Sequence, residues 1–308
     1  MTEAGGRPGF SRNTQGALWM LLSAVTFSIM TTLIKFLGDD YPAALQAFYR
    51  QAAGLVILLP IIIRRRGAAF ATTRPGILFF RSAAGTLGMI LSFYAFQEMP
   101  LADANALSFT RTLWLVPLAA FVVRETVGPL RIGAALVGFL GVLLMVRPGA
   151  SGEFALGLPA LAMLTASFLF ALTITGMKVM TRDHSPTVLL VWAATLGFLF
   201  SIPGAFFGWR WPAPMDLALL CAMGVLGTIT QACYIKGMQL GDAGAMAPID
   251  YTRLVFSVIA GFLLFHELPS VWTMAGAGIV VASTLFITIR EQQLARSAKL
   301  SAMRDGEG

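Results

Sequence analysis

The residues best suited to chemistry in this sequence are ionisable side chains inside long apolar runs. The run 241–265 carries Asp250 and Arg253 near its middle, and an earlier run, 101–123, carries Arg111. An ionisable side chain at the centre of a bilayer costs about 2.5–3.5 kcal/mol on insertion scales, so each is a functional candidate. Two guanidinium groups that face one cavity can bind a carboxylate, a phosphate or a zwitterion in bidentate geometry.

Helical spacing extends this predicted substrate site. Residues three apart share a helix face, which predicts one stripe of Asn105, Ser108, Arg111 and Trp114. The site is completed by polar or aromatic residues inside other apolar runs and beside Asp250: Arg50, Arg81, Phe93, Tyr94, Gln231, Tyr234 and Tyr251. Ordinary packing is the alternative for the aromatic residues. Arg50 and Arg81 lie nearer the ends of their runs and could instead extend toward the membrane surface.

Asp250 is the one acid near the middle of a run, which makes it the candidate carrier of a coupling proton. Its neighbour Arg253 favours the opposite interpretation, because a paired carboxylate has a lowered pKa. An Asp250–Arg253 pair could also be a structural lock, since buried ion pairs often fix helix register and bind no ligand.

Motifs for other chemistry are missing from the sequence. It contains no HExxH, no GxxxxGK[ST] and no GxSxG pattern. The two cysteines and two histidines are not spaced as metal ligands: Cys221, Cys233, His184 and His266. We therefore expect no metal, no cofactor and no enzymatic activity.

The composition predicts an all-α membrane protein. Of 308 residues, 57% are hydrophobic and 12% are charged, against about 25% charged in soluble proteins. The formal charge of +7 does not indicate nucleic-acid binding, because the basic residues lie at the ends of apolar runs. Ten runs are long enough to span a bilayer: 16–37, 44–63, 76–97, 101–123, 128–146, 154–179, 186–207, 214–238, 241–265 and 270–289.

The distribution of Lys and Arg predicts the orientation of these ten spans. Alternate connections and the two ends hold fifteen of the 22 basic residues, whereas the other connections hold three. The positive-inside rule therefore places both termini in the cytoplasm. The first run is too long for a signal-peptide core and is expected to be retained. Residues 291–308 are expected to form a polar, mobile C-terminal tail.

The second half of the chain repeats the first. Segment 85–106 aligns with 224–245 through matching Gly, Met, Leu and Asp residues. The alignment also pairs polar residues of two later runs: Arg111 with Arg253 and Glu125 with Glu267. This predicts two five-helix repeats, 1–150 and 151–308. Because five is odd, the repeats must insert in opposite senses, an architecture of secondary transporters with the substrate site at the repeat interface.

Several segments resemble the EamA type of the drug/metabolite transporter superfamily over about residues 16–290. They are AFYRQAAG, TTRPGILFFRS, LADANAL, QLGDAGAMAP and VGFLGVLLMVRPG. The resemblance implies a carrier in a bacterial inner membrane that moves a small polar or zwitterionic metabolite. TRPGILFFR and STLFITIREQ look most similar to the branch that takes up S-adenosylmethionine.

Other functions of the same fold stay open at this point. They are export of amino acids, riboflavin or drugs, and the sequence does not give the oligomeric state. A function of another class, a membrane scaffold without transport, is disfavoured because a scaffold has no need of costly midplane arginines. The expected partners are thus a small-molecule metabolite and the lipid bilayer, without nucleic acid.

Overall fold

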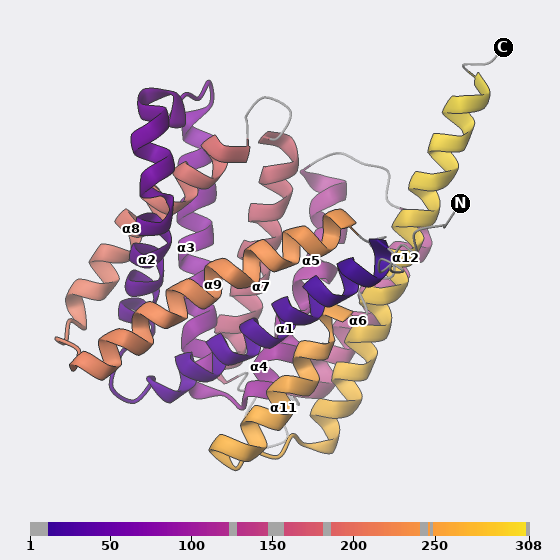
Figure 1. The fold of residues 1–308 in the computed structure, drawn as a ribbon. Helices are drawn as coiled ribbons and strands as arrows, with labels where there is room; N and C mark the ends of the chain where they lie inside the picture. The colour runs from indigo at the N-terminus through magenta and orange to yellow at the C-terminus, as the bar shows by residue number, and fades with distance from the viewer. Residues whose placement is uncertain are drawn as a thin grey trace, which may run out of the picture.

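The structure is a computed structural model, and it describes residues 12–122, 128–146, 157–180, 186–240, 246 and 249–305. All regular structure in these residues is helical (Figure 1). The helices are α1 (Arg12–Phe36), α2 (Ala43–Arg65), the 3-10 helix η1 (Arg66–Ala69), α3 (Pro75–Glu98), α4 (Leu101–Ser108), α5 (Thr110–Phe121), α6 (Pro129–Val146), α7 (Leu158–Met180), α8 (Pro186–Phe207), α9 (Pro214–Leu240), α11 (Thr252–Phe265) and α12 (Val271–Asp305).

The helices confirm the predicted all-α membrane class. Among the residues that the structure describes, seven helices are long and apolar enough to cross a bilayer, and α6 and α11 are apolar but shorter. Their outer faces expose large hydrophobic side chains, such as Phe206 at 77% and Phe207 at 90%. Such a surface is stable in lipid and not in water, so the chain is a multi-pass integral membrane protein.

Two predicted spans differ from continuous helices. The span 101–123 is broken at Phe109, between α4 and α5, and α11 begins only at Thr252 after a turn at Tyr251. A threonine follows each of these turns. The Thr110 hydroxyl donates to the Leu107 carbonyl at 2.7 Å, and the Thr252 hydroxyl donates to the Ile249 carbonyl at 2.6 Å. Such hydroxyl bonds compete with the helical backbone ladder and favour a local break.

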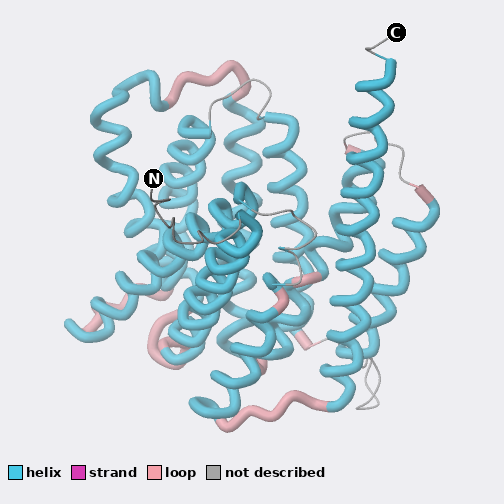
Figure 2. The backbone as a smooth tube through the Cα atoms, turned by 45° about the vertical axis from the view of Figure 1, so that its right-hand side comes forward, coloured by secondary structure: helices cyan, strands magenta, loops and turns pink. Residues whose placement is uncertain are grey.

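The C-terminal segment is also different from the expected mobile tail. α12 continues without interruption to Asp305, and its end projects beyond the bundle (Figure 2). Residues 291–305 are rich in Ala, Leu, Gln, Lys and Arg, which all have high helix propensity. The high helix propensity of these residues therefore explains why the last helix continues through them.

The main helix contacts join the first half of the chain to the second. α1 packs along α9, α3 along α7, α2 along α8 and α6 along α12. Glycines permit the closest of these approaches. A Cβ added at Gly141 of α6 would lie 2.9 Å from the carbonyl oxygen of Gly276 in α12. The two halves are thus interleaved, and a cavity lies between them.

Candidate functional site

A cavity of about 320 Å³ lies among α1, α2, α3, α4, α5, α7, α8, α9 and α11. Its volume is at the lower end of the range of small-molecule sites. The wall is contributed by helices from both halves of the chain, so a ligand there would contact both halves at once. Movement of the halves relative to each other would therefore change the access to this cavity.

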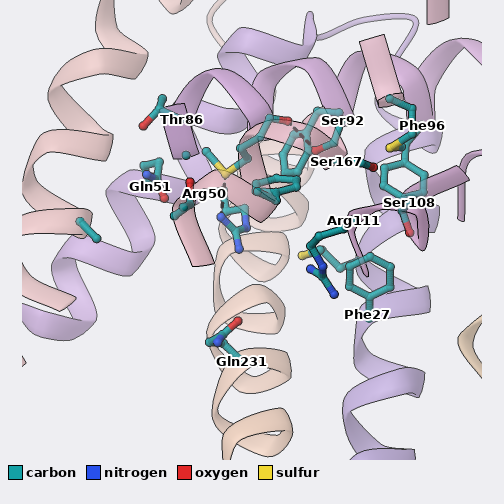
Figure 3. Close-up of a pocket in the computed structure, with 18 of the residues that line it drawn as sticks. Phe27, Arg50, Gln51, Thr86, Ser92, Phe96, Ser108, Arg111, Ser167 and Gln231 are labelled. Atoms are coloured by element: carbon teal, nitrogen blue, oxygen red, sulfur yellow. Dashed lines mark hydrogen bonds between the residues drawn. The ribbon is translucent and has the colours of Figure 1, made fainter. Parts of the chain in front are cut away.

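Four arginines from four helices reach this cavity. They are Arg50 of α2, Arg81 of α3, Arg111 of α5 and Arg253 of α11. Arg81 and Arg253 are only 8% and 7% exposed, and the other two are half-buried. Figure 3 shows Arg50 and Arg111 projecting into the same space. The alternative that Arg50 and Arg81 extend toward the membrane surface is therefore not what the structure shows.

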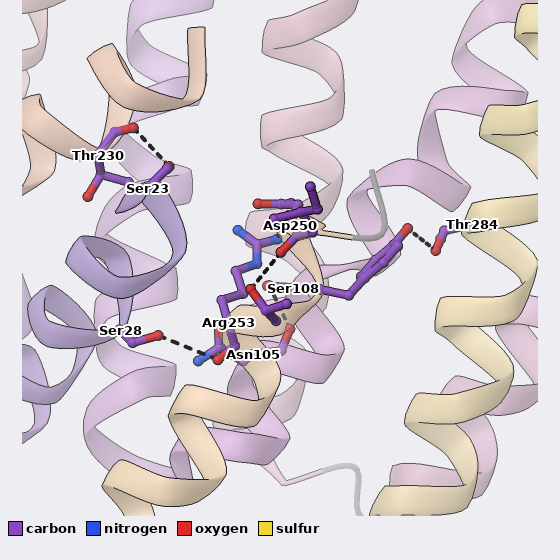
Figure 4. Close-up of polar contacts among 11 residues, drawn as sticks. Ser23, Ser28, Asn105, Ser108, Thr230, Asp250, Arg253 and Thr284 are labelled. Atoms are coloured by element: carbon purple, nitrogen blue, oxygen red, sulfur yellow. Dashed lines mark hydrogen bonds and ion pairs between the residues drawn. The ribbon is translucent and has the colours of Figure 1, made fainter. Parts of the chain in front are cut away.

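Arg253 is held by contacts on several sides. Its guanidinium carbon lies 4.5 Å from the ring centre of Phe109 and 5.0 Å from that of Phe27, as in cation–π pairs. Nη2 lies 3.4 Å from Oδ2 of Asp250, and both side chains are mostly buried (Figure 4). Asp250 itself is not on the cavity wall. The ion pair expected from the sequence therefore exists, and it orients an arginine that also faces the cavity.

Arg50 depends on a glycine for its position. A Cβ at Gly227 of α9 would lie 2.8 Å from Nε of Arg50, so a larger residue there would displace the guanidinium. Nη1 of Arg50 contacts the sulfur of Met89 at 2.7 Å, which is a weak acceptor. Within the described part of the chain, Nε of Arg50, Arg81 and Arg253 is buried without a hydrogen-bond partner.

The two helix breaks contact each other beside the cavity. The rings of Phe109 and Tyr251 meet edge to face with their centres 4.7 Å apart. Arg111 and Arg253 are the second residues of α5 and α11, the helices that begin after these breaks. Neither helix start has a side-chain cap, and a helix N-terminus carries partial positive charge. The Tyr251 hydroxyl also donates to Thr284, which joins this region to α12.

Seven of the residues predicted from the sequence line the cavity: Arg50, Arg81, Phe93, Ser108, Arg111, Gln231 and Arg253. The other six predicted residues are not on its wall: Tyr94, Asn105, Trp114, Tyr234, Asp250 and Tyr251.

Two members of the predicted stripe have structural contacts instead. Nδ2 of Asn105 donates to Oγ of Ser257, so this amide links α4 to α11. Trp114 packs edge to face between Phe139 and Phe168. Because Asn105 faces α11 and Trp114 packs against α6 and α7, the members of the stripe that line the cavity are Ser108 and Arg111.

Sequence reasoning missed most of the α3 face of the cavity. Ser82, Thr86, Ser92 and Phe96 line it together with Arg81. Thr86, Met89 and Phe96 lie four, seven and fourteen residues after Ser82, as on one helix face, so this signal was present in the sequence. Other lining residues, such as Ser167 of α7, are single polar residues in apolar helices and give no periodic signal.

A second polar cluster joins the ends of α1, α3 and α11 to the start of α4. Nζ of Lys35 donates to the Met99 carbonyl at 2.6 Å and forms an ion pair with Glu267. The second carboxylate oxygen of Glu267 accepts the backbone N–H of Leu101 at 2.9 Å, which satisfies an otherwise free donor at the start of α4. His266 adopts a left-handed conformation with φ of 55°, which turns Glu267 toward this contact. We call these contacts the Lys35–Glu267 latch.

Further contacts join the α1–α2 connection to the start of α9 and the segment before it. The Tyr41 hydroxyl donates to Asp216 at 2.8 Å, and this hydrogen bond raises the pKa of Tyr41 above its usual value. Arg210 donates to the Asp40 carbonyl at 3.1 Å in an exposed position. Exposed contacts of this kind contribute little to stability.

Comparison with known proteins identifies the class. The model of the EamA-like transporter family matches residues 14–147 and again 157–289, so the chain belongs to this family and contains two of its repeats. The resemblance found in the sequence is thereby confirmed. A solved crystal structure shares the fold, with a TM-score of 0.60 at 16% identity over 90% of this chain and 98% of its own.

Individual relatives are transporters by name. The chain is 31% identical to the S-adenosylmethionine uptake transporter of Rickettsia prowazekii over 278 residues, which cover 90% of this chain and 94% of the relative. It is 28% identical to the riboflavin transporter of Rhizobium johnstonii, covering 93% of this chain and 95% of the relative. The pseudopaline exporter CntI of Pseudomonas aeruginosa is 26% identical, covering 89% and 95%.

Proposed function

We propose that the chain is a secondary transporter that moves a small polar or zwitterionic organic metabolite across a bacterial inner membrane by alternating access. The observation that carries this proposal is the convergence of four arginines on one cavity between the two halves. Each poorly solvated guanidinium costs several kcal/mol when no partner compensates it. A scaffold or an enzyme without a catalytic constellation would gain nothing from this cost, whereas a carrier recovers it when substrate binds.

The relatives suggest candidate substrates for this chain. Uptake of S-adenosylmethionine is the first candidate, because its transporters are similar over nearly the whole chain. Transport of riboflavin and export of a compound like pseudopaline are alternatives that other relatives suggest. Export of amino acids or drugs is a further alternative within the same fold. The candidates that contain an amino acid group share a carboxylate. Paired arginines bind carboxylates especially well because they can form two parallel hydrogen bonds.

We further propose that the halves 1–150 and 151–308 are inverted repeats. The support is the similar position of the two helix breaks, each followed by the pair Thr-Arg, at Thr110–Arg111 and Thr252–Arg253. Transporters with inverted repeats place broken helices of this kind around a substrate site at the repeat interface.

The proposed orientation gives the Lys35–Glu267 latch a role. With both termini in the cytoplasm, as the distribution of Lys and Arg favours, the latch lies at the periplasmic end. It ties α1 and the start of α4 to the end of α11, and α11 carries Arg253 of the cavity. Opening toward the periplasm would then require the latch to break.

Asp250 is the proposed coupling residue. Protonation of its carboxyl would remove the ion pair with Arg253 at 3.4 Å and leave this arginine free for substrate. Proton binding and substrate binding would thereby be linked through one side chain.

Transport by the purified protein is the test of the proposal. Proteoliposomes containing the protein should accumulate at least one of radiolabelled S-adenosylmethionine, S-adenosylhomocysteine or riboflavin above the level of empty liposomes. We expect the initial rate to saturate with substrate concentration, because a carrier has a finite number of sites. Uptake of none of these compounds, in either membrane orientation, would favour the scaffold.

A further inference from the structure

The cavity carries an excess of positive charge. Arginine side chains stay protonated at physiological pH, and four of them line one space of about 320 Å³. Among the described residues of the cavity wall there is no Asp or Glu. In the same part of the chain, the one carboxylate paired with any of these arginines is Asp250, which pairs with Arg253. Arg50, Arg81 and Arg111 therefore have no acidic partner among the residues described.

Most of the unsatisfied hydrogen-bonding groups at the cavity are guanidinium donors, beside the hydroxyl of Ser82. Nε of Arg50, of Arg81 and of Arg253 is buried with no described partner. None of these Nε groups bonds to the nearby hydroxyls of Ser92 and Ser108, which donate to backbone carbonyls of their own helices at 2.8 and 2.7 Å. Buried donors in native proteins are almost always satisfied, which points to acceptors supplied by a ligand. Carboxylate and phosphate oxygens match the guanidinium geometry best.

Besides the arginines and several neutral polar residues, the wall has an apolar and aromatic part. Phe27, Phe93, Phe96 and Phe170 line it together with methionines. Arg253 already uses Phe27 for a cation–π contact at 5.0 Å. Flat rings pack well against phenylalanine faces and against guanidinium planes. The cavity thus combines a cationic region with surfaces suited to a flat organic ring.

We infer that the transported compound is an organic anion whose carboxylate or phosphate is bound by the four arginines and whose flat apolar part contacts the phenylalanines. This inference rests on the proposed transport function and narrows its substrate class from polar or zwitterionic metabolites to anions, which ranks S-adenosylmethionine below S-adenosylhomocysteine. A cationic group in the substrate is disfavoured, because like charges repel strongly in a cavity with little water. S-adenosylmethionine carries a sulfonium cation that S-adenosylhomocysteine lacks, so we expect the second compound to bind more tightly.

Matched ligand pairs test the inference on the purified full-length protein. The pairs are AMP with adenosine, riboflavin 5′-phosphate with riboflavin, and S-adenosylhomocysteine with S-adenosylmethionine. Thermal-shift titrations should give a dissociation constant about tenfold lower for the first member of each pair, since a charge-assisted hydrogen bond is worth about that factor. The first two pairs test a phosphate, and the third tests the penalty for a cation.

Variants of the cavity arginines complete the test. Arg50→Gln and Arg81→Gln should reduce the preference for the anionic member, and Arg50→Lys should retain part of it because the charge is kept. Arg64→Gln is the matched control, since Arg64 is exposed at the end of α2. Equal or tighter binding of the neutral or cationic members, or no binding of any anion, would overturn the inference. If proteoliposomes still transported a panel compound in that case, the proposed function would stand and only the charge selection would fall.

Discussion

Arg111→Ala and Arg253→Ala should each reduce transport by roughly 100-fold while the protein still inserts into the membrane. The expected size follows from the loss of about two charged hydrogen bonds to the substrate, each worth about 1.5 kcal/mol or more. Arg253 is held between Phe27 and Phe109 and next to Asp250, so its guanidinium is already oriented for binding. The measurement is the initial uptake rate in proteoliposomes at equal protein content.

The control for these variants is Arg64→Ala, because Arg64 is exposed and does not line the cavity. Its transport should equal that of the wild type. Elution of each variant as a monodisperse peak from size-exclusion chromatography in detergent shows that loss of activity is not loss of folding. Near-normal uptake by both Arg111→Ala and Arg253→Ala would rule out the cavity as the substrate site.

Breaking the Lys35–Glu267 latch should shift the protein toward states that are open at the latch end. Glu267→Gln keeps an oxygen that can accept the N–H of Leu101 but loses the ion pair with Lys35. A charged contact of this kind is worth about 1.5 kcal/mol, so the population of the open state should rise by roughly tenfold. The rate at which a membrane-impermeant thiol reagent, added from that end, labels Ser167→Cys in the cavity should rise accordingly.

A double-mutant cycle separates the latch from general destabilisation. Lys35→Met should increase labelling like Glu267→Gln, and the double variant should add little beyond either, since both remove the same interaction. Arg210→Gln is the matched control, because the hydrogen bond of Arg210 to the Asp40 carbonyl is exposed and lies outside the latch. Unchanged labelling in both single variants would show that the latch does not control access.

The sequence located the charged centre of the site because ionisable residues are rare in apolar runs. Arg111 and Arg253 were visible for this reason, and both line the cavity. The residues that contact these arginines were harder to predict. Phe27 contacts Arg253 across the bundle, and no local pattern connects two residues so far apart in the chain.

The helix break at Phe109 was not predicted, because the apolar run 101–123 has no residue near Phe109 that ends a helix. The run 241–265 does contain such a signal, since Pro248 lacks a backbone N–H and favours a kink shortly before Tyr251. A hydroxyl bond from Thr110 or Thr252 accompanies each break, and the rings of Phe109 and Tyr251 pack together there. The ring packing is a tertiary contact between segments far apart in the chain, and such contacts override local propensity.

The Lys35–Glu267 latch also could not be predicted from the sequence. Its members come from the ends of α1 and α11 and from the α3–α4 connection. A lysine and a glutamate at helix ends are common in membrane proteins and usually face the aqueous interface. Only the arrangement of the helices, together with the left-handed conformation of His266, brings the two charges together.

Substrate protection of a cysteine in the cavity tests the central claim most directly. Ser167→Cys would be made after replacing Cys221 and Cys233 with serine, and Ala68→Cys, at an exposed position of η1, is the control. The account predicts that a compound transported in proteoliposomes slows thiol labelling at position 167 and leaves position 68 unchanged. A transported compound that leaves labelling at position 167 unchanged would contradict the assignment of this cavity as the substrate site.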